Sequence, residues 1–64
     1  MYAQEIIKRT DDKIIIKIFD KQGRFITKGN WFNDNILDFC LTNRFKKVEV
    51  EYVTTEYISF RIVD

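Results

Sequence analysis

The chain has 64 residues, of which 45% are hydrophobic, 16% aromatic and 33% charged, and its formal net charge is +1. This length excludes a multidomain protein and the composition predicts a folded chain, so we expect a single domain over residues 1–64. Because it has one cysteine, no apolar run of membrane-spanning length and no apolar leader sequence, we expect a cytoplasmic protein without a membrane partner.

Residues 2–9 are predicted to form the first strand of a sheet. The turn that follows, at residues 10–12, is rich in side chains that favour turns. A loop of this length places Ile6 opposite Ile16 on the core side of the sheet.

Residues 13–19 are predicted to form the central strand, because they make the longest run of β-branched and aromatic residues in the chain. Side chains alternate between the two faces of a strand. One face is purely apolar and is assigned to the core; it carries Ile14, Ile16 and Ile18. The other face is mixed and carries Lys13, Ile15, Lys17 and Phe19.

A turn closed by Gly23 in a left-handed conformation is predicted to lead to a third strand at residues 24–28. In this register Phe25 lies opposite Phe19 on the mixed face, and Ile26 joins the core face. The first half of the chain is therefore expected to be a three-stranded meander.

Asn33 is a typical helix N-cap residue, and the apolar spacing after it predicts a helix over residues 33–42. Residues 45–53 and 57–63 are predicted to form a final hairpin with one apolar face, on which lie Val48, Val50, Ile58, Phe60 and Ile62. The expected fold class is α+β: a small antiparallel sheet in the order β-β-β-α-β-β, with one short helix packed on one face.

We expect no enzymatic activity, cofactor or bound metal. There is no histidine to act as a base near neutral pH, and Cys40 falls on the apolar stripe of the helix without a neighbouring base. The only glycines, Gly23 and Gly29, cannot build a phosphate-binding loop, and no calcium-loop spacing is present.

The mixed face of the meander is the best candidate for a binding surface. Six Phe, three Tyr and one Trp are more aromatic side chains than a core of this size readily hides, and exposed apolar groups often mark partner sites. Residues 1–28 also carry seven basic and four acidic side chains. The candidate partner-binding residues are Lys13, Ile15, Lys17, Phe19, Arg24, Phe25 and Trp31.

Three occupants of this face stay open. A second copy of the chain would form a homodimer, a protein partner would be anchored on Phe19 and Phe25, and a nucleic acid would stack on the aromatic rings with its phosphates on Lys and Arg. An unpaired edge strand offers a further route to a partner.

The hairpin–helix–hairpin order expected for residues 13–63 is similar to that of immunoglobulin-binding bacterial domains of the protein L and protein G kind. No motif residue is shared, so no site residue is carried over. In size and composition the chain resembles small phage-encoded inhibitors of host enzymes or of bacterial defence systems, anti-CRISPR proteins among them. We therefore expect a small non-enzymatic protein-binding module, an inhibitor that acts by surface occlusion, with a small nucleic-acid-binding domain as the alternative.

Overall fold

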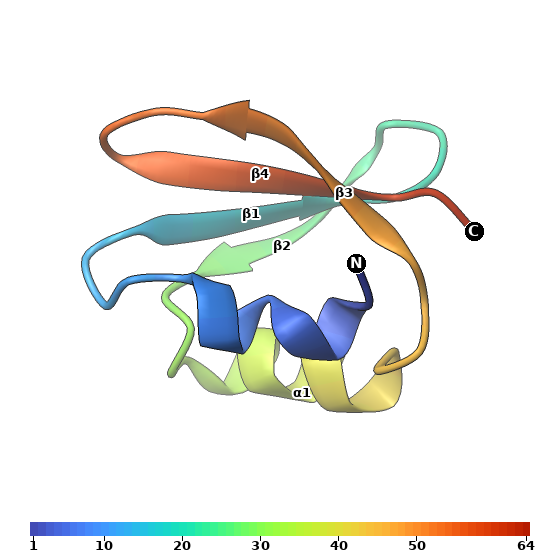
Figure 1. The fold of residues 1–64 in the computed structure, drawn as a ribbon, viewed down its shortest axis with the longest axis horizontal. Coiled ribbons are helices and arrows are strands. Elements are labelled where there is room, and N and C mark those ends of the chain that lie inside the picture. Colours follow the sequence, from blue (N-terminus) through green and yellow to red (C-terminus); the bar gives the residue numbers. More distant parts are fainter.

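The computed structural model describes all 64 residues and shows a four-stranded sheet with its helices on one side (Figure 1). In chain order the elements are the 3₁₀ helices η1 (Ala3–Glu5) and η2 (Ile7–Arg9), strands β1 (Ile15–Phe19) and β2 (Phe25–Gly29), helix α1 (Asp34–Thr42), and strands β3 (Val48–Val53) and β4 (Tyr57–Ile62). The strand order is β2-β1-β4-β3. This confirms the α+β class.

The sheet is mixed, so the expectation of a purely antiparallel sheet is wrong. The pairs β1–β2 and β3–β4 are antiparallel hairpins, whereas β1 and β4 run parallel at the centre of the sheet. Ile16 lies beside Ile58 and Ile18 beside Phe60 in this central pair. Strand β4 thus takes the side of β1 that the N-terminal segment was expected to occupy.

The prediction of a strand at residues 2–9 is wrong, because this segment forms η1 and η2. Ala3 and Ile6 are both fully buried, and their spacing of three residues matches one turn of a 3₁₀ helix. The carboxylate of Glu5 accepts a hydrogen bond from the backbone N–H of Tyr2 at 2.6 Å. Alanine and long charged side chains favour helix over strand, and here they outweigh the pair of isoleucines that suggested a strand.

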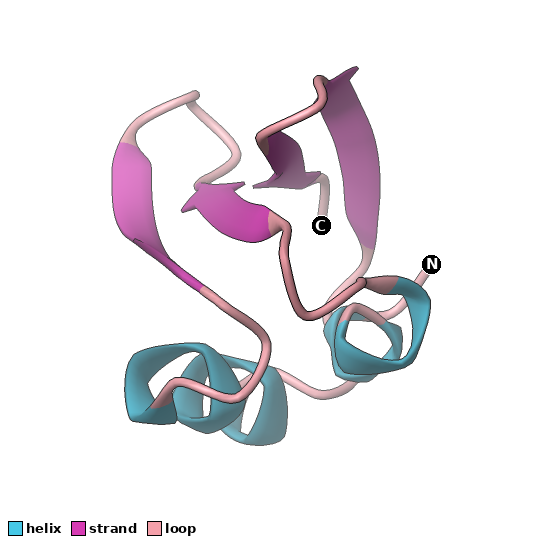
Figure 2. Cartoon of the chain, turned by 90° about the vertical axis from the view of Figure 1, so that its left-hand side faces the viewer, coloured by secondary structure: helices cyan, strands magenta, loops and turns pink.

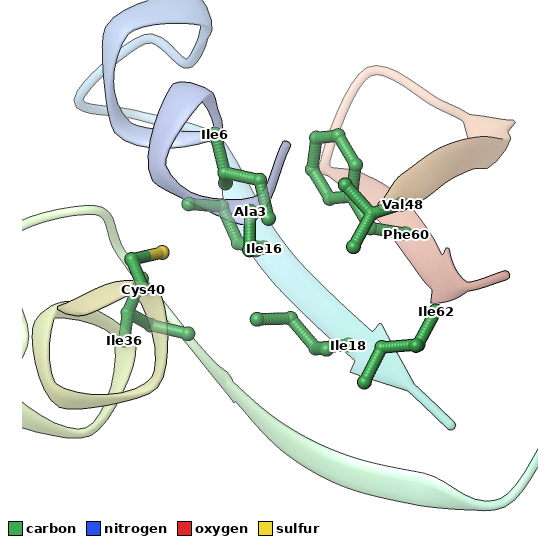
Figure 3. Packing of buried hydrophobic residues seen from close by; sticks show 9 residues of the cluster. All are labelled: Ala3, Ile6, Ile16, Ile18, Ile36, Cys40, Val48, Phe60 and Ile62. Atoms are coloured by element: carbon green, nitrogen blue, oxygen red, sulfur yellow. The ribbon is translucent and has the colours of Figure 1, made fainter. Parts of the chain in front are cut away.

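The hydrophobic core lies between the sheet and the helices, and η1, α1, β1, β3 and β4 each contribute buried residues to it (Figure 3). Its nine buried residues are Ala3, Ile6, Ile16, Ile18, Ile36, Cys40, Val48, Phe60 and Ile62. The core face assigned to Ile16 and Ile18 is confirmed. Val50 was expected on the same face, yet it is 47% exposed because it lies on the edge strand β3.

The β1–β2 hairpin has the predicted turn and, at its first pair, the predicted register. Gly23 has a φ of 86°, and Phe25 pairs with Phe19. A bulge at Ile26 then shifts the register by one residue, so that Thr27 takes the position facing the core. The predicted core position of Ile26 is therefore wrong, and its side chain is 40% exposed.

The β3–β4 hairpin likewise follows the predicted register over its first half. Val50 pairs with Phe60 as expected. A bulge at Glu51 then brings Tyr52, rather than Glu51, opposite Ser59, and the hydroxyl of Ser59 accepts the N–H of Tyr52 at 3.1 Å. The bulge moves the backbone N–H of Tyr52 out of its regular ladder position, so this donor needs another acceptor. The hydroxyl of Ser59 provides that acceptor.

Helix α1 begins and ends within one residue of the predicted bounds. Hydrogen bonds connect its first residues to the end of β2. Asn33 is the N-cap residue, but its side chain accepts the backbone N–H of Asn30 at 2.7 Å instead of capping the helix. Asn35 donates to the carbonyl of Lys28 at 2.8 Å. A Cβ atom at Gly29 would lie 2.8 Å from the Asn33 side-chain oxygen, so this close approach requires glycine.

We expect the substitution Ile16→Ala to lower the free energy of unfolding by about 2–5 kcal/mol, because Ile16 is fully buried in the central strand. Chemical denaturation followed by circular dichroism measures this loss. Val53→Ala is the matched control, since Val53 is a strand residue that is 68% exposed. Equal losses for the two variants would show that Ile16 does not support the core.

Candidate binding face

The side of the sheet opposite the helices is covered by no other element of the chain (Figure 2). Directly paired residues on neighbouring strands point to the same side of a sheet, so the registers identify the side chains of this surface. We call it the open face. From β2 to β3 it consists of Phe25, Lys28, Ile15, Lys17, Phe19, Tyr57, Ser59, Arg61, Glu49 and Tyr52.

Four of the predicted site residues lie together on the open face: Ile15, Lys17, Phe19 and Phe25. The rings of Phe19 and Phe25 make an edge-to-face contact, with their centroids 5.8 Å apart. Phe19 is half-buried and Phe25 is 57% exposed. An exposed ring supported by a second ring is a rigid apolar group that is available to a partner.

The other three predicted site residues lie outside the open face. Lys13 is exposed in the turn before β1. Arg24 is in the β1–β2 turn, where its guanidinium pairs with the Asp20 carboxylate at 2.9 Å. Trp31 lies between β2 and α1, where it packs against the core and donates its indole N–H to a carboxylate oxygen of Asp12 at 2.8 Å. The structure therefore does not bring these three together with the phenylalanine pair.

Tyr57 and Lys28 belong to the open face, although neither is among the predicted partner-binding residues. Tyr57 arrives through the parallel pairing of β4 with β1, and its ring lies 3.8 Å below the Lys17 ammonium. Lys28 arrives through the bulge in β2, which moves it opposite Lys17. The alternation of Tyr57, Ser59 and Arg61 along β4 was the available signal, but it gives no information on which strand lies beside β4.

Two hollows flank the side chains of Lys17 and Tyr57, which line both of them. The first has a volume of about 310 Å³ and lies near Ile15, Lys28 and Asn30. We call it the Lys17–Lys28 pocket. The second has a volume of about 330 Å³, and its wall includes Phe19, Tyr52 and Ser59. The open face is therefore not a flat apolar surface, because it has a hollow on either side of the Lys17 side chain.

Charge is divided across the open face. The β1–β2 half carries Lys17 and Lys28, and the β3 edge carries Glu49 and the bulge residue Glu51. Arg61 lies between them, with its Nε 2.9 Å from a carboxylate oxygen of Glu51. One side of this surface is therefore basic and aromatic, and the other is acidic.

Both edges of the sheet are partly closed. The backbone N–H of Val48 on β3 donates to the carbonyl of Met1 at 2.8 Å, and the Met1 amine donates back to the carbonyl of Val48 at 3.2 Å. On β2 the backbone carbonyl of Lys28 accepts a hydrogen bond from the side chain of Asn35. Bulges and such contacts shorten the free edge on which a partner strand can pair, so the open face is the larger free surface.

The titratable groups with shifted pKa values lie away from the open face. Burial raises the pKa of the Cys40 thiol to about 11, and this side chain is in the core. A hydrogen bond from the Arg24 backbone N–H, with further help from the Arg24 side chain, lowers the pKa of Asp20. No group of three or more His, Cys, Asp or Glu side chains is arranged to hold a metal ion, and no helix has the length and apolar character needed to span a bilayer.

We expect Cys40 to react slowly with a thiol reagent in the native protein, because only the thiolate is nucleophilic and burial suppresses it. Timed labelling with 5,5′-dithiobis(2-nitrobenzoate) at pH 8 measures the rate. The same protein unfolded in guanidinium is the control and should react rapidly. Native labelling as fast as the unfolded control would show that the thiol is accessible.

Asp20 predicts a pH dependence of stability with a definite sign. Its pKa is lowered in the folded state, so its stabilising contribution is present above its ordinary pKa and is lost as the pH falls from that value through the lower pKa of the folded state. Melting temperatures measured across this range should therefore fall less steeply for Asp20→Asn than for the unchanged protein. Asp38→Asn, at an exposed helix position, is the control. Parallel curves for Asp20→Asn and the unchanged protein would contradict the assignment.

The chain was also compared with known proteins. No family model matches it, and neither a curated protein nor a solved structure matches it. The geometry of the open face is therefore the basis for a proposed function.

Proposed function

We propose that the protein is a non-enzymatic protein-binding module that holds its partner on the open face. The observation that carries this proposal is the uncovered pair of rings of Phe19 and Phe25, next to the stacked Lys17 and Tyr57. Exposed aromatic side chains with charged groups beside them are common in protein-binding hot spots.

The proposed mode of action is occlusion, as in a phage-type inhibitor of a host enzyme or of a bacterial defence complex, similar to anti-CRISPR proteins. A small rigid sheet that presents one exposed face can block a functional surface without any catalytic group of its own. The small size and aromatic-rich composition of the chain support this mode. The acidic β3 edge, with Glu49 and Glu51, gives such an inhibitor a group that can pair with a basic groove.

Nucleic-acid binding is the second candidate function, because the open face places Lys17 and Lys28 beside aromatic rings. The acidic side chains Glu49 and Glu51 at the β3 edge oppose it, since they repel a phosphate backbone laid across the sheet. A homodimer through the open face is also disfavoured. The charged side chain of Lys17 lies at its centre, whereas the centres of stable homodimer interfaces are depleted of charge.

Affinity capture from a lysate of the native host tests the proposal, with the full chain as bait. We expect Phe25→Ala to reduce recovery of the partner at least tenfold, because truncation of an aromatic anchor typically costs about 2 kcal/mol or more. Phe45→Ala is the matched control, since Phe45 is 67% exposed but is not on the open face. Equal recovery with both variants would show that the open face does not hold the partner.

An oligonucleotide gel-shift assay at low salt, run on the same protein, tests nucleic-acid binding. We expect no shift of the oligonucleotide. A tight shift that weakens steeply with salt, together with no recovered protein partner, would replace the proposed function by nucleic-acid binding. Sedimentation at micromolar concentration should give the monomer mass of 7.8 kDa, and a dimer mass would favour the homodimer.

A further inference from the structure

We propose that the partner inserts a carboxylate side chain into the Lys17–Lys28 pocket, and that it does so from an extended segment with an apolar side chain nearby. This inference rests on the proposed function and names the chemistry of its partner. The feature that supports it is a pair of neighbouring lysines on the open face that have no acidic partner within the chain.

Lys17 and Lys28 are directly opposite each other on neighbouring strands. Like charges in this position destabilise a sheet. Neither ammonium is in an ion pair, and the ion pairs of the chain use the guanidinium groups of Arg9, Arg24 and Arg61 instead. Two cations that repel each other beside a pocket form a site that an anion would stabilise.

The position of Lys17 is fixed before any ligand arrives. Its ammonium lies 3.8 Å from the centroid of the Tyr57 ring, and the side chain is half-buried. A cation–π contact of this kind limits the rotamers of the lysine, so less conformational entropy is lost when an anion binds. Partial burial also weakens the competition from solvent and salt.

Part of the polar lining of the pocket is already engaged within the chain, and one of its side chains is acidic. The side-chain nitrogen of Asn30 donates to the carbonyl of Asp12 at 2.8 Å, and the side-chain oxygen of Asn33 accepts the backbone N–H of Asn30. Glu56 also lines the pocket. Two lysines and one glutamate leave a net charge of +1, which matches a single carboxylate better than a phosphate or a run of phosphates.

The surroundings of the pocket indicate where the carboxylate comes from. Phe19 is two residues from Lys17 on the same face of β1, a separation of about 6.6 Å, and Phe25 lies beside it. An extended segment also places alternate side chains on one side at this spacing. A partner segment with an acidic residue and an apolar residue two positions apart can therefore place its carboxylate at the Lys17 edge of the pocket and its apolar side chain at the phenylalanine pair.

Titration of the ¹⁵N-labelled full chain with the peptide acetyl-Thr-Glu-Thr-Leu-Thr-amide, at constant ionic strength, tests this inference by NMR. We expect saturable amide shifts centred on Lys17, Lys28 and Tyr57. The same peptide with Gln in place of Glu should bind about fivefold more weakly, the effect of one exposed charge pair. The oligonucleotide dT₆ should bind no better than the Gln peptide.

Lys28→Ser supplies the second readout, with Lys46→Ser, an exposed lysine outside the open face, as the matched control. Lys28→Ser should remove the preference for Glu over Gln and raise the melting temperature of the free protein, because it ends the repulsion with Lys17. Lys46→Ser should change neither quantity.

Equal binding of the Glu and Gln peptides, no binding of either, or an unchanged preference in Lys28→Ser would each overturn the carboxylate pocket. The proposed function would still stand if capture of the native partner depended on Phe25. Tighter binding of dT₆ than of the Glu peptide would overturn the pocket in favour of a phosphate site, and capture that is insensitive to Phe25→Ala would overturn the proposed function separately.

Discussion

The parallel pairing of β1 with β4 joins two hairpins that are far apart in the sequence. On the inner side of the sheet, this pairing brings Ile16 and Ile18 against Ile58 and Phe60, so it closes the core. On the outer side, the same pairing places Lys17 over the ring of Tyr57. The core and the open face therefore depend on one register, and a shift of one residue would exchange the side chains of the two faces.

Local sequence signals were sufficient for the parts of the fold that local physics determines. Gly23 provides the positive φ of the hairpin turn, Asn33 marks the start of the helix, and Val50 and Phe60 pair as their alternation indicates. The sequence could not predict which hairpin edges meet, because neighbours in a sheet are chosen by tertiary packing and no single segment records that choice. The N-terminal segment was misassigned for a related reason: Ile6 is buried from the turn between η1 and η2, and burial alone does not separate helix from strand in a short segment.

In the candidate site, too, local alternation predicted some positions and tertiary structure determined the others. Ile15, Lys17 and Phe19 were placed correctly because they alternate along one strand. Lys28 was missed because one bulge residue, Ile26, reverses the side on which every later residue of β2 points. Trp31 was selected as an aromatic candidate anchor, but its ring packs against the core and its indole N–H has a partner within the chain, so it supports the fold.

The position of β4 inside the sheet also has a consequence for the synthesis of this chain. β4 is synthesised after the other elements, and until it pairs with β1 that strand has one unpaired edge. Sheets closed by such distant contacts form slowly, and an open strand edge is a template for pairing with other chains. The chain is thus most prone to aggregation until β4 pairs with β1, and the production of soluble protein depends on how quickly that strand is inserted.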